Sequence, residues 1–208
     1  GEPLAVSTPV ISVWANPAVL AESERLGELA AALGIEQPAL RARLERYSGK
    51  QFMYLQRHMV PEEAREILSL RIKGVRGERE YRRFYPAGEV ASQLVGLTNV
   101  DDQGIAGMEL AYNDWLKGVP GKKRYIKDLH GEVVRDIGVV EPARPGKDLS
   151  LSIDLRLQYL QHRELRKAVT AIGAASGTIV TLDSHSGEIL AMVNYPGYNP
   201  NSSKRIDP

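Results

Sequence analysis

The chain has 208 residues, of which 43% are hydrophobic, so it can bury a core and is long enough for one or two domains. Charged residues make up 25% and the formal net charge is +1, which gives no electrostatic case for a nucleic-acid-binding protein. Cysteine is absent, which excludes disulfides, thiol nucleophiles and thiolate metal sites. No run approaches about 18 apolar residues and the first residues do not form a leader, so we expect a soluble chain.

The N-terminal part predicts one strand followed by two helices. Leu4–Val13 is rich in Val, Ile, Ser and Thr and predicts a strand interrupted by Pro9. Asn16-Pro17 supplies a capping residue and a proline at the first helical position, and Gly34 ends that helix. A second short helix begins near Pro38. The apolar face of the first helix consists of Leu26, Leu29, Ala30 and Leu33.

The next segment predicts a strand, a helix and a solvated strand. Phe52–Leu55 is aromatic and apolar, as in a strand, and Pro61 starts a helix whose first acids suit the helix dipole. Val75–Phe84 is dense in Arg and Glu, which indicates a solvent-facing strand. His58 stands without a second ligand at metal-binding spacing, so we expect a surface or hydrogen-bonding role for it rather than a metal site.

The central stretch, Arg83 to Gly121, is the best-marked part of the chain. Pro86 and Gly88 predict a turn, and Glu89–Leu97 a short helix. A polar turn follows, and a second helix is predicted from Gly107 to Lys117, with Tyr112 and Trp115 packed in the core. Arg83 and Glu109 are predicted to form a partly buried ion pair that joins the turn to this helix, with separate surface roles as the alternative.

The last part predicts a hairpin, a boundary and a second, smaller unit. Lys122–Ile126 and Glu132–Ile137 read as strands around a turn with Gly131, and residues 138–146 form the best boundary. The basic run at Lys122 is interpreted as a solvated strand. Leu149–Ile153 then predicts a strand, and Asp154 caps a helix. The apolar side of this helix is Leu157, Leu160, Leu165, Ala168, Val169 and Ile172.

A final hairpin, Thr178–Leu182 with Glu188–Val193, is apolar on both faces and turns at residues 183–187. Such a hairpin belongs in a covered sheet. Three arrangements remain open for it: packing against a second copy as a homodimer, a swapped exchange, or support from the preceding module.

The spacing of the central residues resembles the N-terminal, non-catalytic module of class B penicillin-binding proteins, and the short turn before Gly104 resembles the division type. Three motifs carry the resemblance: Arg83-x-x-Pro86-x-Gly88, Gly104-x-x-Gly107-Met108-Glu109 and Leu116-x-Gly118-x-x-Gly121. The segments Tyr54-Leu55-x-Arg57, Pro61-Glu62-Glu63-Ala64, Pro145-Gly146-Lys147 and Asp154-Leu155-x-Leu157-Gln158 are also similar to that family.

The resemblance implies an α+β fold: an elongated pedestal of short helices and antiparallel hairpins over residues 1–146, then a helix and hairpin from the start of a transpeptidase domain over residues 147–208. In this family, chemistry depends on Ser-x-x-Lys, Ser-x-Asn and Lys-Thr-Gly or Lys-Ser-Gly motifs. No serine here has lysine three residues on or asparagine two residues on, and neither Lys-x-Gly form occurs. We therefore expect this chain to be non-catalytic, although its parent is a serine-type D,D-transpeptidase.

The resemblance also implies a cellular setting. The parent would cross-link septal peptidoglycan, anchored in the inner membrane of a Gram-negative bacterium by a helix upstream of this chain, on the periplasmic side. Its implied partners are division-machinery membrane proteins, including the glycan polymerase. Peptidoglycan substrate would bind only through the missing domain. No cofactor, metal or nucleic acid is expected.

Two other functions stay open from the residues. The module itself could bind glycan through exposed Tyr and Trp side chains. A hydrolase using Asp101 or Asp102 is disfavoured, because adjacent carboxylates point in different directions. His185, between two serines, fits turn chemistry better than a catalytic triad. Gly104-x-x-Gly107 follows a polar turn and not an apolar strand, so it is a weak nucleotide-binding signal.

Overall fold

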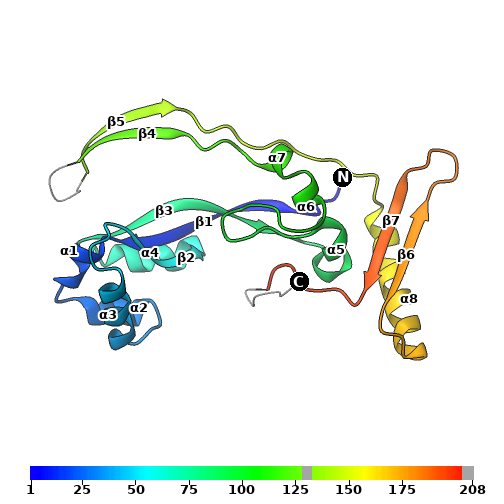
Figure 1. Ribbon diagram of the computed structural model, residues 1–208, viewed down its shortest axis with the longest axis horizontal. Coiled ribbons are helices and arrows are strands. Elements are labelled where there is room, and N and C mark those ends of the chain that lie inside the picture. The colour runs from blue at the N-terminus through cyan, green and yellow to red at the C-terminus, as the bar shows by residue number, and fades with distance from the viewer. Residues whose placement is uncertain (128–132, 203–208) are drawn as a thin grey trace. The chain divides into compact units, whose positions relative to one another are not determined.

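The computed structural model describes residues 1–127 and 133–202, and the chain has an α+β fold with antiparallel sheets (Figure 1). The described residues divide into two compact units. One unit comprises residues 7–82, and the other comprises residues 1–6, 83–127 and 133–202. We call them the sheet unit and the motif unit.

The sheet unit contains a sheet of order β2-β1-β3, with β1 at Val6–Ala15, β2 at Met53–Met59 and β3 at Val75–Phe84. The predicted interruption of β1 by Pro9 is wrong. Pairing of β1 with β2 begins at Ile11, so Pro9 lies beyond that ladder, where a missing N–H is tolerated.

Four helices contribute side chains to the core of the sheet unit: α1 (Pro17–Ala21), α2 (Leu26–Ala32), α3 (Gln37–Arg46) and α4 (Pro61–Ser69). Asn16 caps α1 as predicted, its side chain accepting from Ala18 N at 3.1 Å. The buried cluster draws on β1, β2 and all four helices: Val13, Ala15, Leu20, Leu26, Leu29, Ala30, Leu33, Leu40, Leu44, Met53, Leu55, Met59, Ala64, Ile67 and Ile72.

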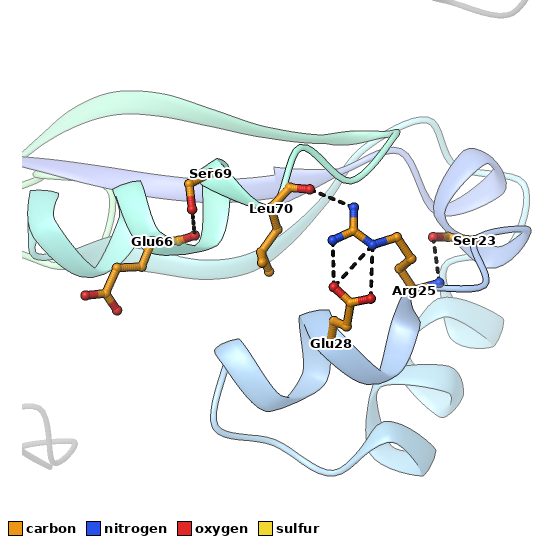
Figure 2. Close-up of polar contacts among 6 residues, drawn as sticks. All are labelled: Ser23, Arg25, Glu28, Glu66, Ser69 and Leu70. Carbon is orange, nitrogen blue, oxygen red and sulfur yellow. Dashed lines mark hydrogen bonds and ion pairs between the residues drawn. The ribbon is translucent and has the colours of Figure 1, made fainter.

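A single helix from Pro17 to Leu33 was predicted, and that prediction is wrong because the chain breaks between α1 and α2. Figure 2 shows the contacts of Arg25 at the break. Arg25 Nη1 donates to Leu70 O at 2.8 Å, just after α4, and its Nη2 lies 2.6 Å from Glu28 Oε2. Ser23 Oγ accepts from Arg25 N at 3.2 Å. Two local contacts and one long-range bond to Leu70 hold a turn that helix periodicity alone does not reveal.

The sheet unit also carries a polar cluster centred on Glu80 of β3. Glu80 accepts hydrogen bonds from the hydroxyls of Ser12 and Tyr54 and lies 3.3 Å from Arg57 Nη2. Burial opposes its ionisation, but these bonds and the guanidinium charge outweigh burial and lower the pKa of Glu80. His58 Nε2 lies 3.5 Å from Glu80 Oε2, and the backbone N of His58 donates to Ser12 Oγ at 3.1 Å. The surface or hydrogen-bonding role expected of the imidazole stays a prediction.

The motif unit is built from short helices, two hairpins and one long helix. Its elements are η1 (Gly88–Val90), α5 (Ser92–Val95), α6 (Gly107–Ala111), α7 (Asn113–Leu116), β4 (Lys122–Lys127), β5 (Val133–Glu141), α8 (Leu155–Ile172), β6 (Gly177–Leu182) and β7 (Ile189–Tyr195).

Two central helices predicted as continuous are each broken in two. Glu89–Leu97 divides at Ala91 into η1 and α5, and α5 ends where Gly96 takes φ 81°. The helix predicted from Gly107 divides at Tyr112, whose backbone leaves the helical region at φ −114° and ψ 24°. Tyr112 and Trp115 are exposed, so the prediction that they pack in the core is also wrong.

Helix α8 begins as predicted. Asp154 Oδ1 accepts from Arg156 N at 2.9 Å and Leu157 N at 3.3 Å. Its apolar side was only partly identified, because Leu160 and Ile172 are exposed. The buried positions repeat at helical spacing and include two polar residues: Gln158, His162, Leu165 and Val169. The strand predicted just before α8 is not formed, although Asp154 N donates to Leu190 O at 2.9 Å.

Strands β6 and β7 pair from Gly177–Tyr195 to Leu182–Ile189 and lie beside α8, as Figure 1 shows. In their turn, Asp183 Oδ1 accepts from His185 N at 2.7 Å and Ser186 N at 3.2 Å, which confirms the turn chemistry predicted for this segment. One face of the hairpin packs on α8 through Val193 and Ile179, while Val180 is exposed on the other.

Strands β4 and β5 form a separate two-stranded ribbon (Figure 1). The predicted turn with Gly131 lies outside the described residues. Lys122 Nζ lies 3.1 Å from Glu141 Oε1, and both side chains are exposed, as expected for a solvated strand. Nowhere in the described part of the chain could a helix span a bilayer.

Candidate functional site

The ion pair predicted between Arg83 and Glu109 is present. Arg83, just before the turn, donates from Nε to Glu109 Oε1 of α6 at 2.7 Å. The Glu109 side chain is 5% exposed and that of Arg83 is 22% exposed. A charge-assisted bond between groups so little exposed fixes α6 against the end of β3.

The turn between these charges also has the predicted residues. Gly88 takes φ 53°, where a side chain is strained, and its N donates to Tyr85 O at 3.0 Å. Pro86 precedes it in the same turn. The hydroxyl of Tyr85 accepts from Thr98 N at 3.0 Å. Burial raises the pKa of Tyr85 to about 12, against the opposing effect of that hydrogen bond.

Gly104 and Gly107 lie where two backbone segments touch. A Cβ on Gly104 would lie 1.9 Å from Glu109 O, and one on Gly107 would lie 2.6 Å from Gly96 N. Gly107 also takes φ 58°. Only a residue without a side chain allows these approaches, so Gly104 lets the loop before α6 contact the backbone of α6, and Gly107 lets the start of α6 contact the end of α5.

Gly118 and Gly121 make the same kind of contact with a different segment. A Cβ on Gly118 would lie 2.7 Å from Arg144 O, and one on Gly121 would lie 2.6 Å from Ala143 N. Val119 and Arg144 exchange backbone hydrogen bonds of 2.8 and 2.9 Å between these two glycines. The third motif therefore binds the residues that follow β5.

The structure shows one residue whose role the sequence did not reveal, Gln158 of α8. It is fully buried, and its Nε2 donates to Val90 O at 2.9 Å and to Met192 O at 2.7 Å. Its Oε1 accepts from Met192 N at 2.9 Å. Gln158 thus joins α8, β7 and η1. Gln158 belongs to the segment Asp154-Leu155-x-Leu157-Gln158, which is similar to the family, but its burial was not predicted. Glutamine in a helix usually faces water.

Asn201 was missed as well. Its Oδ1 accepts from Tyr85 N and its Nδ2 donates to Tyr85 O, both at 2.9 Å. Tyr198 OH donates to Ser92 O at 2.9 Å nearby. The segment after β7 therefore contacts residues 85–93, which agrees with support of the hairpin by the preceding module, one of the three arrangements left open. The homodimer stays a prediction.

Comparison with known proteins agrees with this geometry. The model of the penicillin-binding protein dimerisation domain matches residues 1–151. The chain belongs to this family. Relatives include a probable peptidoglycan D,D-transpeptidase PbpC of Pseudomonas aeruginosa, 44% identical over the whole chain, and the peptidoglycan D,D-transpeptidase FtsI of Escherichia coli, 43% identical over 97% of it. The chain spans 37% and 35% of their lengths.

Solved structures of penicillin-binding proteins share the fold of this dimerisation domain. Penicillin-binding protein 2X of Streptococcus thermophilus superposes with a TM-score of 0.66 at 22% identity, covering 98% of this chain and 34% of that one. A penicillin-binding protein of Helicobacter pylori, solved in complex with MreC, gives 0.66 at 20% identity, covering 96% of this chain and 41% of that one.

Asp101 and Asp102, the adjacent acids considered for hydrolase chemistry, lie in the loop before α6. Asp101 N donates to Asn99 Oδ1 at 2.9 Å, and Asp102 takes φ 56°, so both belong to a turn. The described residues contain no cluster of His, Asp and Glu that could hold a metal ion. The motif residues join backbone segments through close approaches at glycines and through one ion pair.

Proposed function

We propose that this chain is the non-catalytic pedestal of a septal peptidoglycan D,D-transpeptidase, and that its motif unit fixes the orientation of the catalytic domain. Residues 1–146 would form the pedestal, and residues 147–208 the start of the transpeptidase domain. The supporting observation is that residues 147–208 form hydrogen bonds with the central stretch at two places. Gln158 bonds Val90 O, and Asn201 bonds both backbone groups of Tyr85.

The physical argument is one of preorganisation. Buried hydrogen bonds to backbone groups cost free energy when a partner is lost, so they favour one relative orientation of the parts they join. Residues 85 and 90 lie between the charges of the Arg83–Glu109 ion pair in sequence and belong to the same compact unit. An enzyme domain held in this way would keep its active site at a constant position relative to the pedestal.

The test uses the full-length parent protein with Gln158→Ala and Asn201→Ala combined. We expect labelling by a fluorescent penicillin to stay within about twofold, because the catalytic residues are untouched. Septal cross-linking in a strain depleted of the native enzyme should fall at least fivefold. Gln161→Ala is the matched control, since Gln161 bonds Thr181 inside the helix and hairpin and not the central stretch.

Faster hydrogen exchange at residues 85–98 in the double variant would establish that the contact between the two parts has been loosened. Normal cross-linking by a variant loosened in this way would refute the positioning role. Loss of penicillin labelling would also count against the proposal, because it would mean that the two residues support the catalytic fold itself.

The same proposal includes a location and partners. We infer that the parent lies in the bacterial inner membrane with this chain in the periplasm at the septum, and that the pedestal contacts the glycan polymerase of the division machinery. The H. pylori relative solved with MreC supports an associative role for such modules. A titration of this chain against the detergent-solubilised polymerase tests it. Saturable binding is expected, and its absence at high micromolar concentration would refute recognition by this chain.

A further inference from the structure

A hollow of about 700 Å³ lies over the loop before α6, the end of α6 and helix α7, inside the motif unit. It contains an aromatic pair that was predicted to be buried. The exposed fraction is 43% for Tyr112, 47% for Trp115 and 55% for Leu110, and all three line the hollow. Its volume is in the range of small-molecule sites, about 300–1,000 Å³.

Trp115 is held in place although it is exposed. Its indole Nε1 donates to Asp148 O at 3.1 Å, its backbone O accepts from Lys147 N at 3.1 Å, and Lys147 Nζ lies 4.2 Å from the centre of the ring. A surface tryptophan without a function would gain little from such fixation. A ligand that stacks on it avoids the entropy cost of ordering a free ring.

The loop beside Trp115 is fixed as well. Asn113 Oδ1 accepts from Gly104 N at 2.9 Å and ties α7 to the loop that lines the hollow. The lining also includes one neutral, one acidic and one basic side chain, those of Gln103, Asp114 and Lys117. The lining contributes one carboxylate and one ammonium group, and Lys147 adds a second ammonium group over the Trp115 ring. The hollow therefore carries no strong net charge, which favours a polar ligand with an apolar face.

A sugar ring has that chemistry, because one face of C–H groups stacks on an aromatic ring while its hydroxyl and amide groups bond polar side chains. We propose that this hollow is a secondary binding site for the glycan strand of peptidoglycan. The choice of this glycan rests on the proposed function, which places the chain beside the polymer. The site would hold a strand on the pedestal, apart from the peptide chemistry of the catalytic domain.

The test is a titration of the purified chain with peptide-free glycan strands and with a tetramer of N-acetylglucosamine. A Trp14→Phe background leaves Trp115 as the fluorescent reporter, since the chain has two tryptophans. We expect saturable quenching, with amide shifts in nuclear magnetic resonance spectra confined to residues 103–117. Tyr112→Ser and Lys117→Ala should each weaken binding at least fivefold, and Trp115→Leu, followed by resonance shifts, at least tenfold.

Phe52→Ser is the matched control, because it removes an exposed aromatic ring from the sheet unit and should leave binding unchanged. A flat titration with a folded chain would overturn the proposal. So would equal weakening by the control, or shifts elsewhere in the chain. Binding to whole peptidoglycan that survives muramidase digestion would mean that the ligand is a peptide stem or a protein, which also overturns it. None of these outcomes bears on the cross-linking test of the pedestal role.

Discussion

Replacing Arg83 with alanine should destabilise the motif unit by about 3 kcal/mol. The structure sets the scale: the Nε–Oε1 distance is 2.7 Å, and the Glu109 side chain is only 5% exposed. Two charges about 4 Å apart attract by about 4 kcal/mol at an effective dielectric constant of 20. Removing one partner of a buried pair costs about 3–5 kcal/mol, because the other charge remains buried. Arg83 is 22% exposed, which favours the lower end of that range.

The reverse change, Glu109→Ala, should cost about 2 kcal/mol, since the more exposed guanidinium can be hydrated more easily. The double variant should cost about 3 kcal/mol, so the coupling energy between the two side chains should be about 2 kcal/mol. The assay is urea unfolding of the whole chain in the Trp14→Phe background, where Trp115 fluorescence reports on the motif unit alone. If the unfolding free energy depends on urea concentration with the same slope in every variant, differences in the unfolding midpoint measure differences in stability.

The exposed pair of Lys122 and Glu141 is the control, and its double-mutant cycle should show no coupling that the assay resolves. A coupling energy below about 0.5 kcal/mol between Arg83 and Glu109 would refute the reasoning. The ion pair would then be a contact between two independently hydrated groups and not a structural bond.

Three further outcomes are expected. Because the folded-state pKa of Glu80 is lowered, its stabilisation of the sheet unit should be lost as pH falls below about 4.3, and Glu80→Gln should remove that dependence in acid unfolding followed by Trp14. Because the folded-state pKa of Tyr85 is about 12, stability should fall between about pH 10 and 12 as the unfolded chain ionises first, and Tyr85→Phe should reduce that loss in alkaline urea titrations. Gly104→Ala should lower stability by more than about 3 kcal/mol in thermal unfolding, whereas Gly27→Ala, with its nearest contact at 3.6 Å, should be neutral or stabilising by up to about 1 kcal/mol.

Sequence reasoning succeeded where one local rule decides the structure. Asn16 and Asp154 cap helices because their side chains reach backbone N–H groups two or three residues on, and both caps are present. The strand Val75–Phe84 was predicted with its observed bounds, because a segment so rich in charged residues is expected to face solvent. The Arg83–Glu109 pair came from the spacing of a family motif.

It failed where a tertiary contact overrides helical periodicity. Residues 107–116 have the apolar spacing of one helix, yet the chain bends at Tyr112, and Asn113 bonds back to Gly104 N. That bend turns Tyr112 and Trp115 outward and forms the hollow. Gln158 illustrates the same limit, because its burial depends on three backbone groups of β7 and η1 that lie far away in sequence.

The motif glycines and the buried glutamine have one property in common, which is that each makes a close contact with backbone atoms. The glycines allow backbone to approach backbone, and the glutamine bonds backbone groups through its amide side chain. Gly104 lets the loop before α6 touch the backbone of α6, and Gly107 lets the start of α6 touch the end of α5. Gln158 joins α8 to η1 through hydrogen bonds and not through apolar packing. Apolar packing tolerates sliding, since it is non-directional, whereas these contacts each allow one geometry. A module whose role is to hold another domain at a fixed orientation requires the second kind of contact. The pedestal role proposed above therefore accounts for motif residues that are glycines and an ion pair.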